Sequence, residues 1–126
     1  MPSRRSLGGN VRVLLDHNVP YTLKESLTHH AVAAAVDMGW EVLKNGELLR
    51  AAESHGFEVF LTCDQNIAHQ QNLSGRRIAI VAVSTNLWPV MRGSLAPIIR
   101  AVDAAHAGTY RLVVYPKPPL RRRAPP

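Results

Sequence analysis

Two apolar stretches of the chain end in the same polar pattern. Residues 11–15 read Val-Arg-Val-Leu-Leu and are followed directly by Asp16. Residues 58–62 are also mostly apolar and lead through one cysteine to Asp64. Short runs of β-branched, aliphatic and aromatic residues are typical of buried strands. We therefore predict two strands, each followed by a carboxylate and by an asparagine two residues further on.

The apolar pattern elsewhere predicts further strands that alternate with helices. Leu23 and Leu27 lie four residues apart, as on one face of a helix. The nearly continuous apolar run at 76–83 is typical of a parallel strand covered on both faces. This alternation favours an α/β fold with a parallel sheet of about five strands and helices on both faces. The predicted strands are 11–15, 31–36, 58–62, 76–83 and 109–115; the predicted helices are 20–28, a helix from 45–47 to Gly56, 67–71 and 94–105; 40–44 and 86–93 are predicted loops.

Length and composition indicate one domain. A chain of 126 residues can bury a core without a disulfide, and its one cysteine, Cys63, has no partner for an internal one, which favours a reducing compartment. There is no apolar run of about 18 residues that would span a membrane, and no signal-peptide pattern at the N-terminus. We expect a cytoplasmic protein without a membrane partner: a disordered lead at 1–10, a domain at 11–115 and a basic Pro/Arg tail at 116–126.

The net charge of +6 comes from the two ends of the chain. Over residues 11–115 the basic and acidic residues are equal in number. Arg121, Arg122 and Arg123 in the tail are candidates for sequence-independent attraction to the phosphates of a nucleic acid. The alternative is that both ends are solvated and unstructured, without a binding role.

The two strand-end acids predict a metal site. If their strands are neighbours, about 4.8 Å apart, Asp16 and Asp64 meet at one edge of the sheet. Two close carboxylates repel each other unless a cation lies between them. Their hard oxygen ligands favour Mg²⁺ or Mn²⁺, and the chain has no Cys/His cluster with the spacing of a zinc site. The alternative for each acid is a turn residue or a helix cap.

Glu47 is the third candidate ligand, in the first turn of the second predicted helix. An acid there is also favoured simply by the helix dipole, so an ordinary first-turn glutamate remains the alternative. Asn18 and Asn66 are candidate supporting residues, or caps of the helices that follow them. His17 is a candidate contact for a phosphate, although a surface histidine is the commoner case.

The chain resembles a known family in three motifs. They are Val-Leu-Leu-Asp-His-Asn-Val-Pro at 13–20, Asn-Gly-Glu-Leu-Leu at 45–49 and Leu-Thr-Cys-Asp-Gln-Asn at 61–66. In order and spacing these motifs resemble the small PIN-like group related to VapC-type toxin ribonucleases, over residues 11–114.

This resemblance implies a flavodoxin-like three-layer α/β/α sandwich, with the first strand central, and metal-dependent endonucleolytic hydrolysis of RNA. It also implies that Asp16, Glu47 and Asp64 bind Mg²⁺ or Mn²⁺. The expected partners are an antitoxin protein, with this chain as the toxin of a toxin–antitoxin pair, and a second copy of the chain in a homodimer. The chain departs from the family where Asn66 stands in place of a further acid. A slow or inactive enzyme is therefore the alternative.

Two other functions compete with the nuclease. One is a PIN-like module without turnover that binds RNA or a partner protein, which the missing fourth acid and the basic tails favour. The other is a phosphorylated receiver domain, which also has an Asp at a strand end. The receiver ranks last because no second acid stands beside Asp16 and no lysine ends the fourth or fifth strand.

Overall fold

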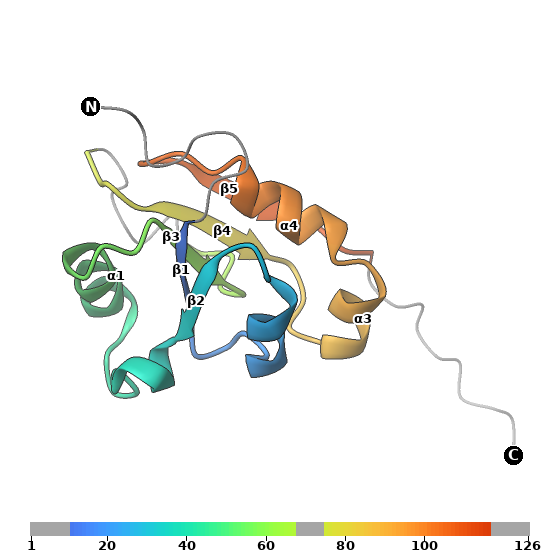
Figure 1. Cartoon of the computed structure of the whole chain (residues 1–126), viewed down its shortest axis with the longest axis horizontal. Coiled ribbons are helices and arrows are strands. Elements are labelled where there is room, and N and C mark those ends of the chain that lie inside the picture. The colour runs from blue at the N-terminus through green and yellow to red at the C-terminus, as the bar shows by residue number, and fades with distance from the viewer. Residues whose placement is uncertain (1–10, 68–74, 117–126) are drawn as a thin grey trace, which may run out of the picture.

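The computed structural model describes residues 11–67 and 75–116, without the side chain of Asn45. Five parallel strands form one sheet in this part of the chain, in the order β2-β1-β3-β4-β5 (Figure 1). The predicted α/β fold with a five-stranded parallel sheet is therefore confirmed. The strands are β1 (Arg12–Leu15), β2 (Ala31–Ala34), β3 (Val59–Thr62), β4 (Ala79–Val83) and β5 (Tyr110–Val113).

Each strand lies within a predicted range, and β1 is an inner strand between β2 and β3. The second strand is shorter than the predicted 31–36 because the chain turns into a 3-10 helix at Ala35. Asp37 stabilises that turn, since its carboxylate accepts a hydrogen bond of 2.9 Å from the backbone N–H of Ala34. The lead at 1–10, residues 68–71 of the predicted third helix and the tail from 117 onwards lie outside the described residues.

Two predictions about the segments that connect the strands are wrong in part. The predicted helix at 20–28 is a 3-10 helix of six residues; its apolar positions Leu23 and Leu27 are nevertheless buried, as the pattern requires. The predicted loop at 86–93 contains an α-helix, because Pro89 lies in its first turn, where a missing N–H costs nothing. The helices are η1 (Tyr21–Ser26), η2 (Ala35–Met38), α1 (Asn45–Ser54), α3 (Trp88–Gly93) and α4 (Ala96–Asp103).

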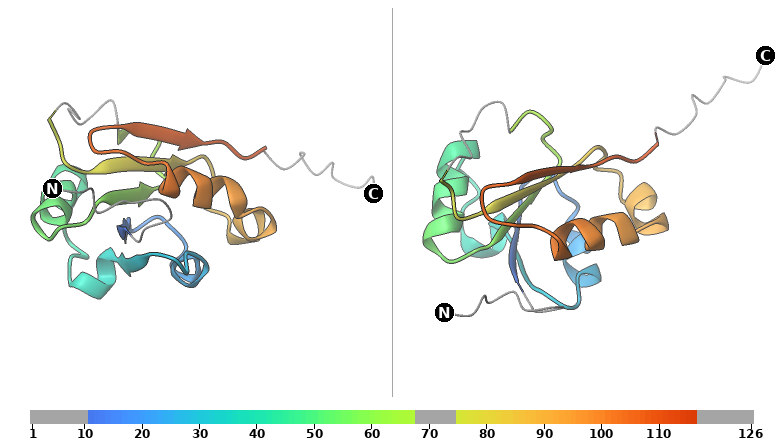
Figure 2. Two further views of the ribbon diagram at one scale, coloured as in Figure 1. Left: turned by 45° about the horizontal axis from the view of Figure 1, so that its top comes forward. Right: turned by 90° about the horizontal axis from the view of Figure 1, so that it is seen from above.

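The buried apolar side chains form two clusters, one on each face of the sheet. Successive residues of a strand point to opposite faces, and in β3 Phe60 belongs to one cluster while Leu61 belongs to the other. Helix α1 packs on the Phe60 face through Leu48 and Leu49. Helices η1, α3 and α4 pack on the Leu61 face, and α4 runs alongside β5 in both views of Figure 2. The sheet is thus covered by helices on both faces.

Candidate functional site

The strand order places the candidate site between β1 and β3. The chain passes from β1 to β2 on one side and then to β3 on the other side of β1. In open α/β sheets, ligands bind outside the carboxyl ends of the strands where the order reverses in this way. Leu15 is the register partner of Leu61, and the N–H of Asp16 donates to the carbonyl of Leu61 at 2.9 Å. The ladder therefore brings Asp16 beside Thr62.

Asp16 is a buried carboxylate, only 6% exposed. Its Oδ2 accepts a hydrogen bond of 2.6 Å from the Thr62 hydroxyl, and its Oδ1 accepts one of 2.7 Å from the backbone N–H of His17. Within the described residues no lysine or arginine forms a salt bridge with it. Each carboxylate oxygen has two acceptor positions. Asp16 is thus held by neutral donors and keeps capacity for a cation.

Thr62 connects the two strand-end acids. The same hydroxyl oxygen that donates to Asp16 accepts a hydrogen bond of 3.0 Å from the backbone N–H of Asp64. The Asp64 side chain is half-buried, and its Oδ1 accepts from the backbone N–H of Asn66 at 2.9 Å. The structure therefore brings Asp16 and Asp64 together at the ends of neighbouring strands, and Asn66 contributes its backbone to the turn there.

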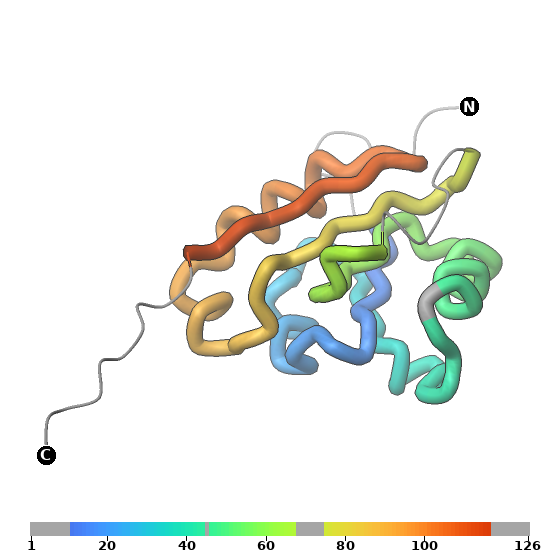
Figure 3. Tube along the Cα trace, turned by 180° about the vertical axis from the view of Figure 1, so that it is seen from behind, coloured from blue at the N-terminus to red at the C-terminus, as the bar shows by residue number. Residues whose placement is uncertain are grey.

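The chain after β3 folds back over the sheet toward β5 (Figure 3). The phenol of Tyr110, at the start of β5, donates to the carbonyl of Gln65 at 3.2 Å. Burial raises the pKa of Tyr110, and the negative charge of Asp64 raises it further. Tyr110 therefore stays protonated and fixes the turn that carries Asp64.

Glu47 lies at the same edge but makes a different contact. Its exposed carboxylate accepts a hydrogen bond of 3.2 Å from the backbone N–H of Lys44 and so caps α1. Near it, the His17 ring forms a 3.1 Å hydrogen bond with the carbonyl of Leu43, which ties the end of β1 to the segment before α1. Among the residues that the structure describes, no group of three His, Cys, Asp or Glu side chains is arranged to hold a metal ion.

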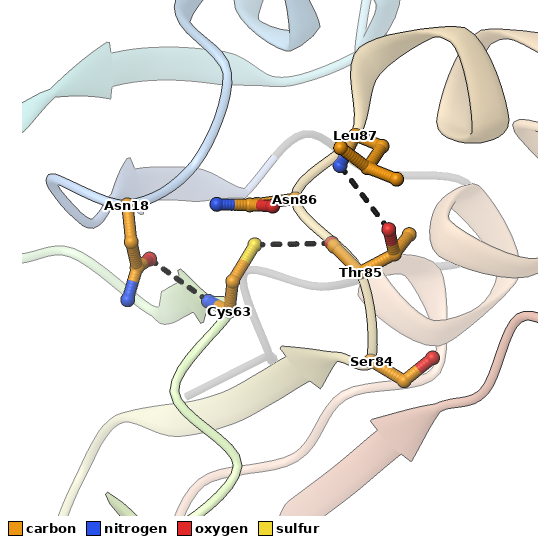
Figure 4. Close-up of a pocket in the computed structure, with 6 residues that line it drawn as sticks. All are labelled: Asn18, Cys63, Ser84, Thr85, Asn86 and Leu87. Atoms are coloured by element: carbon orange, nitrogen blue, oxygen red, sulfur yellow. Dashed lines mark hydrogen bonds between the residues drawn. The ribbon is translucent and has the colours of Figure 1, made fainter. Parts of the chain in front are cut away.

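A pocket of about 500 Å³ opens beside the acids, along the segments that follow β1, β3 and β4. Its wall includes Asn18, whose Oδ1 accepts a hydrogen bond of 2.9 Å from the backbone N–H of Cys63. The Cys63 thiol donates to the carbonyl of Thr85 at 3.3 Å (Figure 4). The lining residues are Asn18, Cys63, Ser84, Thr85, Asn86 and Leu87.

Cys63 has a packing role. Its side chain packs against the core cluster on the Leu61 face. Burial raises the pKa of its thiol to about 12, and the charge of Asp16 adds to the increase. The reactive form of a cysteine is the thiolate. Cys63 therefore remains protonated near neutral pH and is not a nucleophile.

Sequence reasoning missed Tyr110, which reaches the turn after β3 from the start of β5, and three residues of the carboxyl edge: Thr62, Thr85 and Asn86. A signal for the last two was present, because Ser84-Thr85-Asn86 follows the apolar run of β4 as the acids follow β1 and β3. For Thr62, the only signal in the sequence was a hydroxyl side chain in an otherwise apolar strand. The candidate phosphate-binding residues Arg121, Arg122 and Arg123 lie outside the described residues.

The comparisons with known proteins add no assignment. No protein-family model matches the chain, and neither a curated protein nor a solved structure matches it significantly. Among the described residues, no helix has the length and apolar character needed to cross a membrane. The function of the chain is therefore inferred from the chemistry of the carboxyl edge of the sheet.

Proposed function

We propose that this chain is a PIN-like, metal-dependent ribonuclease with a three-layer α/β/α domain. The observation that carries the proposal is the pair of acids, Asp16 and Asp64, at the carboxyl ends of the adjacent strands β1 and β3. The Thr62 hydroxyl donates to the Asp16 carboxylate and accepts from the backbone N–H of Asp64, and so links the two segments. The parallel sheet and the order of its strands agree with the flavodoxin-like arrangement that the PIN-like resemblance implies.

The acid pair fits Mg²⁺ or Mn²⁺. Magnesium is commonly held by one or two carboxylates, with water and substrate phosphates completing its coordination. Asp16 and Asp64 provide two carboxylates, and Asp16 has no cationic side chain among its described contacts. Glu47 is the proposed third acid, because its helix begins at the same edge and the His17 contact with Leu43 holds that segment near β1.

The residues of the chain have separate roles in the proposed hydrolysis. A divalent cation held by Asp16 and Asp64 would supply an activated water and a positive charge that stabilises the leaving oxygen of the phosphodiester. Asp16 and Asp64 hold that charge at the edge of the sheet. Thr62 and the backbone of His17 fix the orientation of the Asp16 carboxylate. Burial of Asp16 limits its exchange with water and strengthens its attraction for a cation.

Two measurements test this proposal. Calorimetric titration with Mn²⁺ is expected to show binding to the wild-type protein and a loss of at least tenfold in affinity for Asp16→Ala. Cleavage of mixed RNAs in Mn²⁺ is expected to stop with EDTA and to fall at least a hundredfold in Asp64→Asn. Equal cleavage by Asp64→Asn and wild type, or cleavage that persists in EDTA, would overturn the nuclease proposal.

The second candidate is a module that binds RNA or a partner protein without turnover. Two observations favour it: Asn66 stands where the family has a further acid, and Glu47 is engaged in capping α1. RNA binding with no cleavage in either Mg²⁺ or Mn²⁺ would support it. For the nuclease, an antitoxin is the proposed partner, and a small antitoxin-like reading frame beside this gene is the expected observation.

A further inference from the structure

The pocket beside the acids has a neutral lining that differs in chemistry from the acid pair. Two side-chain amides, two hydroxyls, one thiol and one leucine line it, and no charged side chain is among these described residues. Its volume of about 500 Å³ is in the range of small-molecule sites. Without a positive side chain it lacks the usual means of holding a phosphate. It suits an uncharged planar group with hydrogen-bonding edges.

The two amides provide the free hydrogen-bonding groups of the pocket. The Oδ1 atom of Asn18 is used by the backbone of Cys63, which leaves the Asn18 NH₂ group as a donor. The Asn86 side chain is exposed, has no hydrogen bond with another described residue, and extends toward Asn18 (Figure 4). Asn86 therefore offers both a donor and an acceptor. Asparagine pairs in this bidentate manner with the edge of a nucleobase.

The hydroxyls of the pocket are less available. Ser84 Oγ accepts from the backbone N–H of Tyr115 at 2.8 Å, and Thr85 Oγ1 accepts from that of Leu87 at 3.1 Å. The Leu87 side chain is 49% exposed and offers an apolar surface against which a base can lie. The recognition chemistry of the pocket thus comes mainly from Asn18 and Asn86.

The pocket and the acids share the same two strand ends. Asn18 lies two residues after Asp16, a backbone span of at most about 7 Å. Cys63, in the pocket wall, lies between Thr62 and Asp64. The hydrogen bond from Cys63 to Asn18 joins these two segments. A group bound in the pocket would therefore lie within a nucleotide's reach of the carboxylates.

We infer that this pocket binds one base of single-stranded RNA, with Asn86 and Asn18 contacting the edge of the base. The inference rests on the proposed nuclease function, because it makes the pocket the base-selecting part of the same site. The adjoining phosphodiester then crosses the strand ends to Asp16 and Asp64. Asn86 is a specificity-determining residue for the RNA in this arrangement.

The test measures binding without turnover. Fluorescence anisotropy in EDTA compares short labelled oligoribonucleotides of A, C or U with an abasic oligomer that has the same number of phosphates. The wild-type protein is expected to bind one of the base-containing RNAs at least tenfold more tightly than the abasic oligomer. Asn86→Ala is expected to reduce that preference about tenfold, the loss of one bidentate contact, and to leave abasic binding unchanged.

Gln65→Ala is the matched control, because it removes an exposed amide side chain that does not line the pocket. It is expected to keep the wild-type preference. Equal binding of all oligomers by the wild type, or an unchanged preference in Asn86→Ala, would overturn the inference. EDTA prevents metal-dependent cleavage during the binding measurement. A base preference that is lost in Asn86→Ala would therefore support base binding in the pocket even if the protein cleaves no RNA. RNA cleavage by a protein that binds all the oligomers equally would support the nuclease proposal and overturn the inference that the pocket binds a base.

Discussion

Glu53 at the amino edge of the sheet and Asp16 at the carboxyl edge are held by different kinds of partner. Glu53 has a cationic one: Arg76 bonds to it at 2.6 Å, and the N–H of Arg77 donates to its other oxygen at 2.8 Å. The buried ring of His30 accepts from the N–H of Val11 and bonds to Asp103 at 2.8 Å. At the carboxyl edge, Asp16 is buried with neutral donors alone.

A carboxylate that pairs with a lysine or arginine has its counterion, whereas a buried one held by neutral donors still has room for a cationic partner. Asp37, which follows the carboxyl end of β2, also shows the first case. It accepts hydrogen bonds from Lys24, Tyr21 and the backbone of Ala34. These contacts, led by the backbone hydrogen bond, lower its pKa to about 2. The contrast indicates that Asp37 is structural and that Asp16 is the acid to test for function.

Among the variants that compare the two edges of the sheet, Thr62→Val is expected to have the largest effect. This change removes the hydroxyl that donates to Asp16 and accepts from Asp64, while it nearly preserves the shape of the side chain. Leaving a buried charged acceptor without its donor costs about 1–3 kcal/mol of unfolding free energy. RNA cleavage is expected to fall at least tenfold because Asp16 loses its orientation. Urea unfolding and RNA cleavage assays measure the two effects.

Thr62→Ser separates the hydroxyl from the methyl group at this position. The serine keeps the donor and acceptor, so cleavage is expected to remain much closer to wild type than in Thr62→Val. An equal loss of cleavage in both variants would show that packing at this position matters more than the hydrogen bonds to Asp16 and Asp64.

Glu47→Gln tests whether the third acid is a ligand or only a cap. The glutamine oxygen can still accept from the backbone of Lys44, so Tm is expected to change by less than about 4 °C, equivalent to roughly 1 kcal/mol. Loss of the charge is expected to lower metal-dependent cleavage about tenfold. Unchanged cleavage with unchanged Tm would assign Glu47 to capping α1 alone.

Glu53→Gln is the matching change at the amino edge. It weakens the pair with Arg76, in which both side chains are mostly buried, at 15% and 17% exposed. We expect a loss of about 1–2 kcal/mol in unfolding free energy and no change in RNA cleavage. A comparable loss of cleavage by the folded variant would contradict the division between a structural edge and a functional one.

The smallest effect is expected for Asp37→Asn and depends on pH. The pKa of Asp37 is lower in the folded protein than its ordinary 3.8, so its charge stabilises the fold above that value. The contribution is lost as pH falls from about 3.8 through 2. The Tm difference between wild type and variant is therefore expected to be present at pH 6 and to close toward pH 2. Thermal unfolding across this range measures it, and a difference that persists unchanged at pH 2 would exclude an origin in the charge.

The sequence determined much of the fold through local patterns. The apolar runs that form β1 and β3 specify their strands, and the acid after each run is where the pattern places it, because a strand buried on both faces leaves its polar residues at its end. Local patterns also predicted the burial of Leu23 and Leu27. They were less informative for helix type, since the same spacing suits the 3-10 helix η1 and an α-helix.

By itself, then, the sequence determined that two acids end two buried strands of a parallel α/β sheet. Only the tertiary structure decided that β1 and β3 are neighbours in a register that places Asp16 beside Thr62. The same pairing joins Asn18 to Cys63, and the neighbouring end of β4 completes the pocket with Asn86. The physical reason is that strand order and register depend on contacts between segments far apart in the chain, which local hydrophobic periodicity does not encode.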